Sequence, residues 1–204
     1  MDLLLDGVAT RFTEGYATSV PQLRKALDAL RQDADGTDGQ LEHWPWLACP
    51  VAPEPIAREL WDDEAWHELA GRAVEIARGL GALGVLPVAL SYRAGVHVHA
   101  GEFAAAAALI TESDAIADAT GSAPLEYSHL MLAAWRGDEA AAVKAIEASV
   151  NGATERGEGR ALAMASYVTA VLYNGLRRYD LALHAARQAC AQEDLRRANN
   201  STPP

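Results

Sequence analysis

The sequence has 204 residues, of which 50% are hydrophobic and 22% charged, and its formal net charge is -11. A chain of this length and composition can bury a sizeable core, so we expect it to be folded. The acidic balance argues against a broad phosphate-binding surface, which needs a basic patch, and we expect no direct nucleic acid binding.

Cysteine usage and the N-terminal sequence indicate where the protein resides. Cys49 and Cys190 are too few and too distant for a disulfide framework, and a reducing cytoplasm is the simplest location for two free thiols. The start, MDLLLDGVAT, lacks the basic region of a signal peptide, and no apolar run approaches the ~20 residues that span a bilayer. We expect a cytoplasmic protein without a disulfide or a membrane segment.

The N-terminal part of the chain predicts one helical hairpin followed by irregular structure. Residues 3–12 and 21–30 carry apolar side chains at helical spacing on either side of the turn EGY. The polar, glycine-rich sequence that follows predicts a mobile loop over about residues 31–43. Four prolines within residues 45–55 exclude a long regular helix before Ile56.

A helical pattern resumes at Trp61. Asp62, Asp63 and Glu64 suit the positive end of a helix, which we expect to run to about Arg78. The sequence GLGALG then satisfies the spacing of a dinucleotide-binding fingerprint. That mechanism needs a preceding strand, whereas this sequence follows a helix, so we interpret it as a helix-ending turn.

The rest of the chain predicts three helical hairpins, each with a short turn between two apolar runs. The turns fall at Gly101, Gly137 and Arg177, which are 36 and 40 residues apart and close to the ~34-residue tetratricopeptide period. The first hairpin pairs residues 85–100 with 104–119, the second pairs 124–136 with the run after 139, and the third pairs 160–176 with 181–191.

Alanine recurs in register with these turns. Ala106, Ala142 and Ala182 each stand five residues past the turn residue. Helix axes that approach to roughly 8–10 Å need a small side chain at the contact. The pattern predicts an all-α right-handed superhelix of about five stacked antiparallel helical hairpins. We expect residues 1–193 to form one tetratricopeptide-like domain and residues 194–204 a disordered tail.

Four phrases occur along the chain in this order: ELWDDEAWHELAGRAVEIARGLGALGVLPVALSYRAGVHVHAGEFAAAAALI, TGSAPLEYSHLMLAAWRGDE, ERGEGRALA and VLYNGLRRYDLALHAARQA. Over residues 1 to about 193 this set resembles the helical-repeat segment of large ATP-binding LuxR-type transcriptional regulators from actinobacteria. The resemblance implies a non-enzymatic sensor or protein-interaction module of transcription regulation, without a cofactor. Its partner would be a protein or peptide, or a small effector.

In that family the segment lies between an AAA-type ATPase and a DNA-binding helix-turn-helix. We expect neither of them here. A Walker motif needs glycine before its lysine, whereas Lys25 follows Arg24 and Lys144 follows Val143. The sequence leaves open whether the chain is a fragment or a truncated gene product.

The register of the three turns predicts a ligand or partner groove along the first helix of each hairpin. The predicted groove residues are Ser91, His99, Tyr127, Met131, Trp135, Met164, Tyr167 and Asn174. This aromatic, apolar and lightly polar mixture suits a peptide or a small apolar ligand. The alternative is that most of these side chains pack between helices.

Two other functions stay open: a stand-alone helical protein that binds a small apolar ligand, and a metal-dependent enzyme on a helical scaffold. Glu64 and His67 could offer two metal ligands from one helix, but no second pair of this spacing accompanies them. His97 and His99 fall on different helix faces, so they cannot easily bind one metal ion together. No G-x-S-x-G elbow, paired CxxC or EF-hand loop appears, and we expect no metal and no catalytic residue. The tryptophans that either contact a ligand or anchor the proline-rich segment are Trp44, Trp46, Trp61 and Trp66.

The last predicted helix carries an apolar stripe too wide for one partner helix to cover. This stripe includes Tyr179, Leu181, Leu183 and Ala186. Exposed apolar surface favours association, and a two-fold contact buries the same patch on both copies. We therefore expect a homodimer formed through the terminal hairpin.

Overall fold

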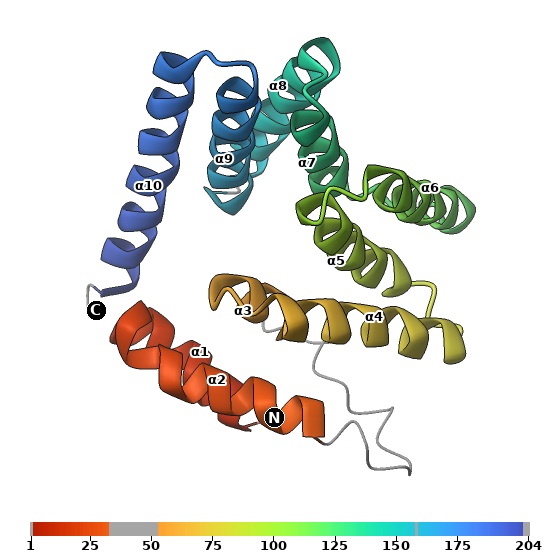
Figure 1. Cartoon of the computed structure of the whole chain (residues 1–204), viewed down its shortest axis with the longest axis vertical. Helices are drawn as coiled ribbons and strands as arrows, with labels where there is room; N and C mark the ends of the chain where they lie inside the picture. Colours follow the sequence, from red (N-terminus) through yellow and green to blue (C-terminus); the bar gives the residue numbers. More distant parts are fainter. Residues whose placement is uncertain (1, 33–52, 158, 202–204) are drawn as a thin grey trace.

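The computed structural model describes residues 2–32, 53–157 and 159–201, and these residues form ten helices and no strand (Figure 1). The helices are α1 (Asp2–Thr13), α2 (Tyr16–Gln32), α3 (Pro53–Glu59), α4 (Asp63–Gly79), α5 (Leu86–His99), α6 (Phe103–Thr120), α7 (Glu126–Arg136), α8 (Glu139–Arg156), α9 (Gly159–Gly175) and α10 (Tyr179–Ser201). The prediction of an all-helical chain is confirmed for this part. Over the same residues, no helix has the length and apolar character to cross a membrane.

The helices pack in neighbouring pairs along the chain. Each odd-numbered helix contacts the even-numbered helix that follows it, most extensively in the pairs α1 with α2, α5 with α6 and α9 with α10. Successive pairs also touch, because α4 packs on α5, α5 on α7, and α7 on α9. The chain curves so that α10 ends beside α1 (Figure 1).

Apolar side chains between the pairs form the core. Leu23, Leu27 and Leu69 are fully buried where α1 to α4 meet, and Leu130 and Leu172 are fully buried between the later helices. Burying one such side chain contributes roughly 1.5–3 kcal/mol. The core is therefore distributed along the stack of pairs.

One turn geometry recurs between paired helices. Gly101, Gly137 and Arg177 adopt left-handed backbone with φ of 78°, 73° and 61°. In each turn the next backbone N–H donates to the carbonyl oxygen five residues earlier, at 2.8 to 3.3 Å. This hydrogen bond closes a helix end, and glycine is its usual residue because other side chains are strained there. The three turn positions predicted from sequence are confirmed.

A fourth turn of the same kind, which the sequence prediction missed, joins α3 to α4. Trp61 has φ of 56°, and the Asp62 N–H donates to the Ala57 carbonyl oxygen at 3.0 Å. Trp61 stands 40 residues before Gly101. The prediction missed it because the left-handed residue is a tryptophan and the preceding helix is short and proline-rich.

The positions five residues past these turns show how the pairs fit together. Ala106 and Ala142 are 0% exposed and Ala182 is 8% exposed, as the small-residue pattern predicted. After the fourth turn this position holds Trp66. Gly95 on α5 faces this ring, because a Cβ atom there would be in van der Waals contact with it at 3.5 Å.

Prolines account for two differences from the predicted helix boundaries. Helix α2 begins at Tyr16 and includes Pro21, although we expected it to begin at that proline. Pro21 is exposed, and the buried residues on the opposite face, such as Leu23, hold the helix despite the missing hydrogen bond. Helix α3 begins at Pro53 instead of Ile56, because the N–H groups of a first turn need no helical partner.

Two predicted irregular segments also differ in part. Arg31 and Gln32, expected in the mobile loop, belong to α2, and the rest of that loop lies outside the described residues. The expected tail from residue 194 is helical as far as Ser201, since α10 continues through it. By contrast, GLGALG is confirmed as a helix-ending turn, since α4 ends at Gly79 and Gly81 has φ of 61°.

Candidate functional site

His99 lies between two tryptophan rings at the end of α5. Its ring centroid stands 5.1 Å from that of Trp66 on α4 and 5.0 Å from that of Trp135 on α7. The His99 Nδ1–H donates to the Gly95 carbonyl oxygen at 2.9 Å, which leaves Nε2 as an acceptor in the neutral ring. Burial, with a smaller effect of the Arg58 charge, lowers the pKa of His99. The imidazole is therefore neutral at neutral pH.

Arg58 and Tyr167 complete the set from two further helices. Burial raises the pKa of Tyr167 on α9, and the positive charge of Arg58 on α3 opposes this effect. The charge of Arg58 thus acts on both Tyr167 and His99. We call Arg58, Trp66, His99, Trp135 and Tyr167 the inner aromatic site.

Four of the eight predicted groove residues lie at or beneath this site. His99, Trp135 and Tyr167 belong to it, and the last two are 36% and 37% exposed. Met131 is 6% exposed and belongs to the core, with its Cε atom 3.3 Å from where a Gly95 Cβ would stand. The structure thus assigns Met131 a packing role.

Among the described residues, no contact links the other four predicted residues to His99 or to the two tryptophan rings beside it. The Ser91 hydroxyl is hydrogen-bonded to the Ser128 hydroxyl at 2.5 Å, and this bond joins α5 to α7. Met164 is half-buried against the core between α5 and α9. Tyr127 is exposed near the start of α7, and Asn174 is exposed at the end of α9.

Sequence reasoning missed Arg58 and assigned Trp66 to a different group. Arg58 stands three residues before the Trp61 turn, so the register would have found it only if that turn had been recognised. Of the tryptophans considered near the proline-rich segment, Trp66 is 6% exposed and Trp61 is 88% exposed. Trp44 and Trp46 lie outside the described residues.

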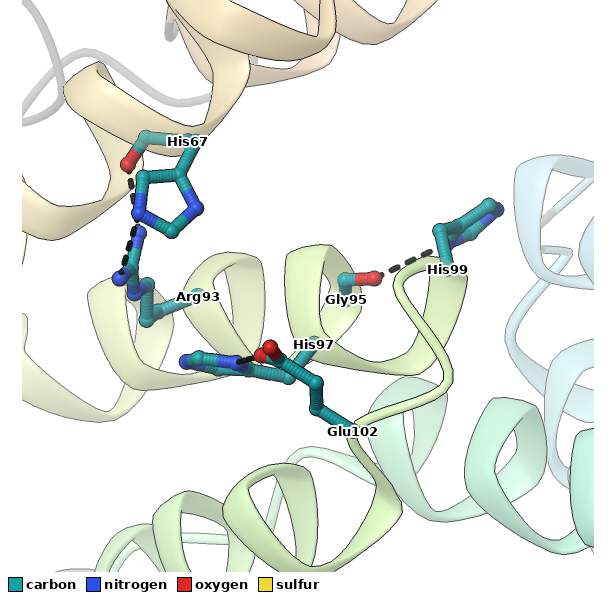
Figure 2. A network of polar contacts seen from close by, with 6 residues as sticks. All are labelled: His67, Arg93, Gly95, His97, His99 and Glu102. Atoms are coloured by element: carbon teal, nitrogen blue, oxygen red, sulfur yellow. Dashed lines mark hydrogen bonds and ion pairs between the residues drawn. The ribbon is translucent and has the colours of Figure 1, made fainter.

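A polar cluster occupies another side of α5 (Figure 2). Arg93 donates to the His67 carbonyl oxygen at 2.5 Å, and His97 Nδ1–H donates to Glu102 Oε2, also at 2.5 Å. The hydrogen bond from His97 is the main cause of the lowered pKa of Glu102. Figure 2 shows His97 and His99 on different sides of α5, so the predicted separation of these histidines is confirmed.

Hydrogen bonds hold the polar groups of this cluster, and Glu64 and His67 both lie beside arginines. Arg31 Nη2 lies 3.5 Å from Glu64 Oε1, and Arg93 Nη2 lies 3.2 Å from His67 Nε2. Glu64 and His67 therefore each interact with an arginine. Among the described residues, no group of three or more His, Cys, Asp or Glu side chains is placed to hold a metal ion.

A shallow hollow of about 260 Å³ lies between α2 and α4. It is lined by Asp28, Arg31, Gln32 and Glu68, and it includes none of the aromatic residues. Arg31 Nε donates to Glu68 Oε2 at 2.7 Å, so the polar groups along this hollow are partly satisfied by each other.

Comparisons with known proteins give no match: no protein-family model, no curated protein and no solved structure is similar to this chain. The resemblance to LuxR-type regulators remains an expectation from the sequence phrases. The interpretation of function therefore depends on the geometry of the inner aromatic site.

Proposed function

We propose that this chain is a non-enzymatic binding module that holds a peptide or a small apolar ligand at the inner aromatic site. The observation that carries the proposal is the packing of His99 on α5 against Trp135 on α7, and the charge of Arg58 on α3 acts on both His99 and Tyr167, which lies on α9. These are the first helices of four successive pairs. Partly exposed aromatic rings provide large contact area with few rotatable bonds, which favours ligand binding.

We further propose that the pairs form a right-handed, tetratricopeptide-like superhelix of about five antiparallel hairpins. The left-handed turns at residues 61, 101, 137 and 177 support this arrangement, because they repeat at intervals of 40, 36 and 40 residues. Stacks of such hairpins present the first helices on a concave face that binds partners. The inner aromatic site would lie on that face.

The chain would serve as the sensor or protein-interaction module of a LuxR-type transcriptional regulator. The ordered phrases of the sequence support this role, as does the way one ligand could contact several pairs. A ligand that touches α5, α7 and α9 together would stabilise their relative positions, since it binds only the arrangement in which all three meet. Ligand binding would then affect the relative positions of successive helix pairs.

A titration with a small aromatic probe tests the binding role. The neutral probe 3-phenylpropanamide has 11 non-hydrogen atoms, so at ~0.3 kcal/mol per atom it should bind with a Kd of about 4 mM. Its addition should shift the NMR signals of the Trp66 and Trp135 indoles in a saturable way. The signal of Trp61, which is 88% exposed, should stay unchanged.

Matched variants decide whether the effect belongs to the site. Trp135→Ala combined with Tyr167→Ala should abolish saturable binding, because both partly exposed rings are removed. Trp61→Ala combined with Tyr179→Ala removes two exposed aromatic residues elsewhere and should leave binding unchanged. Equal binding by the two double variants, or the absence of saturable shifts, would contradict the proposal.

A further inference from the structure

We propose that α10 is the contact surface for a second copy of this chain, which packs against it in antiparallel orientation and pairs Asp180 with Arg187 across a two-fold axis. The homodimer expected from the sequence thereby gains a defined face and a defined orientation. Neither depends on the ligand proposed for the inner aromatic site, so the two proposals can fail independently.

Helix α10 has one covered side and one open side. It packs extensively on α9, and its end lies beside α1 (Figure 1). Ala182 and Ala185 are buried, and they mark the side that α9 covers. Tyr179 and Leu183, by contrast, are 63% and 51% exposed. Large apolar side chains therefore stand in water on the side of α10 that its own chain leaves open.

These exposed side chains belong to a regular stripe, which we call the α10 stripe. Its members are Tyr179, Leu183, Ala186 and Cys190, at i, i+4, i+7 and i+11. Ala186 is half-buried, and the Cys190 thiol is free and exposed. Alternating steps of four and three residues form the seam of a coiled coil, which packs against a second helix of the same spacing. The α10 stripe thus has the pattern of a helix–helix contact.

Two unpaired charges of opposite sign lie along one flank of the α10 stripe. Asp180 and Arg187 each stand one residue after a stripe position, on the flank opposite Ala182. Both are exposed, and no described residue forms an ion pair or hydrogen bond with either. Seven residues separate them, about 10 Å along the helix axis, whereas residues three or four apart are the ones that pair within a helix.

The sizes of the stripe residues suit an antiparallel copy. In that orientation the two-fold axis passes between residues 184 and 185. Leu183 of one copy then faces Ala186 of the other, and Tyr179 faces Cys190. Each large side chain meets a smaller one, so the two helices can approach closely. A parallel copy would place Tyr179 against itself and Leu183 against itself.

The flanking charges favour the same orientation. Antiparallel helices bring equivalent flanks together, so Asp180 lies beside Arg187 of the second copy, and Arg187 beside its Asp180. Two ion pairs form across one axis. Parallel helices pair opposite flanks instead, which would set both charges against the alanine flank at Ala182. Charge complementarity therefore identifies the occupant of this face as a second, antiparallel copy.

Sedimentation velocity tests the face. Wild type should dimerise reversibly at concentrations up to ~0.5 mM, as expected for a small contact surface. Leu183→Glu should weaken dimerisation by about tenfold or more, because it places a charge in the seam. Leu181→Glu is the matched control: Leu181 is 47% exposed but lies on the other side of α10, so the affinity should stay unchanged.

Exchanged charges test the orientation. Asp180→Arg leaves two positive charges on the flank, and Arg187→Asp leaves two negative charges. Each variant alone should dimerise about tenfold more weakly than wild type, because both contacts become repulsive. An equimolar mixture of the two variants should regain the wild-type affinity as a heterodimer. This recovery cannot come from contacts within one chain, because each variant keeps its own like charges.

Three results would overturn the proposal. A monomeric wild type at ~0.5 mM would leave this face to a different protein. A dimer that Leu183→Glu does not weaken would place the contact elsewhere. A mixture that dimerises no better than the separate variants would contradict the antiparallel orientation. Far-UV circular dichroism should match wild type throughout, and Leu183→Gln, Asp180→Lys and Arg187→Glu repeat the test if a variant does not fold.

Discussion

Replacing Glu54 with glutamine should remove a loss in the free energy of unfolding that occurs as the pH rises. Glu54 lies in α3 and is 0% exposed, and neither carboxyl oxygen has a hydrogen-bond partner among the described residues. Burial raises the pKa of Glu54 from its ordinary value of 4.5 to about 7. The folded protein therefore keeps a proton on this side chain that the unfolded chain releases.

The difference between the folded and unfolded pKa of Glu54 sets the direction and size of the change in the free energy of unfolding. As the pH rises from about 4.5 to about 7, the unfolded chain ionises first, so the free energy of unfolding falls. Each pKa unit corresponds to ~1.4 kcal/mol, which gives a loss of about 3 kcal/mol across the window. The contribution of protonated Glu54 to the free energy of unfolding is fully present below that pH window and fully lost above it.

Urea unfolding of wild type, Glu54→Gln and Glu147→Gln at pH 5 and pH 8 measures the loss. Between these two pH values wild type and the exposed control Glu147→Gln should each lose about 2 to 3 kcal/mol relative to Glu54→Gln. His99, whose pKa is lowered, acts in the opposite direction, but it is present in all three proteins and cancels. An identical pH dependence for wild type and Glu54→Gln would refute the reasoning.

Ala106→Leu should destabilise the fold by about 1–3 kcal/mol through overpacking, and Ala105→Leu at the exposed neighbouring position should change little; equal unfolding midpoints would contradict the register. Gly137→Ala should lower the free energy of unfolding by about 1 kcal/mol, because its φ of 73° strains any side chain. Gly84→Ala, where a Cβ atom meets open space, should leave it nearly unchanged. Leu183→Glu should shift a dimer towards monomer in light scattering, and a monomeric wild type would remove the basis for the expected dimer. Elemental analysis should find no stoichiometric transition metal; finding one would contradict a non-enzymatic module.

Turn signals made the later part of the fold predictable from sequence. Glycine at residues 101 and 137 marks left-handed turns directly, and the basic break RRY between two apolar runs located the third turn at Arg177. The buried alanines followed from the same register. Trp61 carries no comparable signal, since a tryptophan with positive φ is held by the packing of the helices on either side.

The candidate site was predictable only in part, for a related reason. Register placed His99, Trp135 and Tyr167 on the first helices of three pairs, and these side chains belong to the inner aromatic site. It did not distinguish them from Met131, because the angle between neighbouring helices decides which side chains stay exposed. Arg58 belongs to the pair whose turn was not recognised.

Intermolecular nuclear Overhauser effects between 3-phenylpropanamide and the wild-type protein test the central claim most directly, because they report which side chains touch the probe. The account predicts contacts from the probe ring to Trp135, Tyr167 and His99. Contacts confined to exposed aromatic residues elsewhere, such as Trp61 and Tyr179, would contradict the assignment of the inner aromatic site as the binding site.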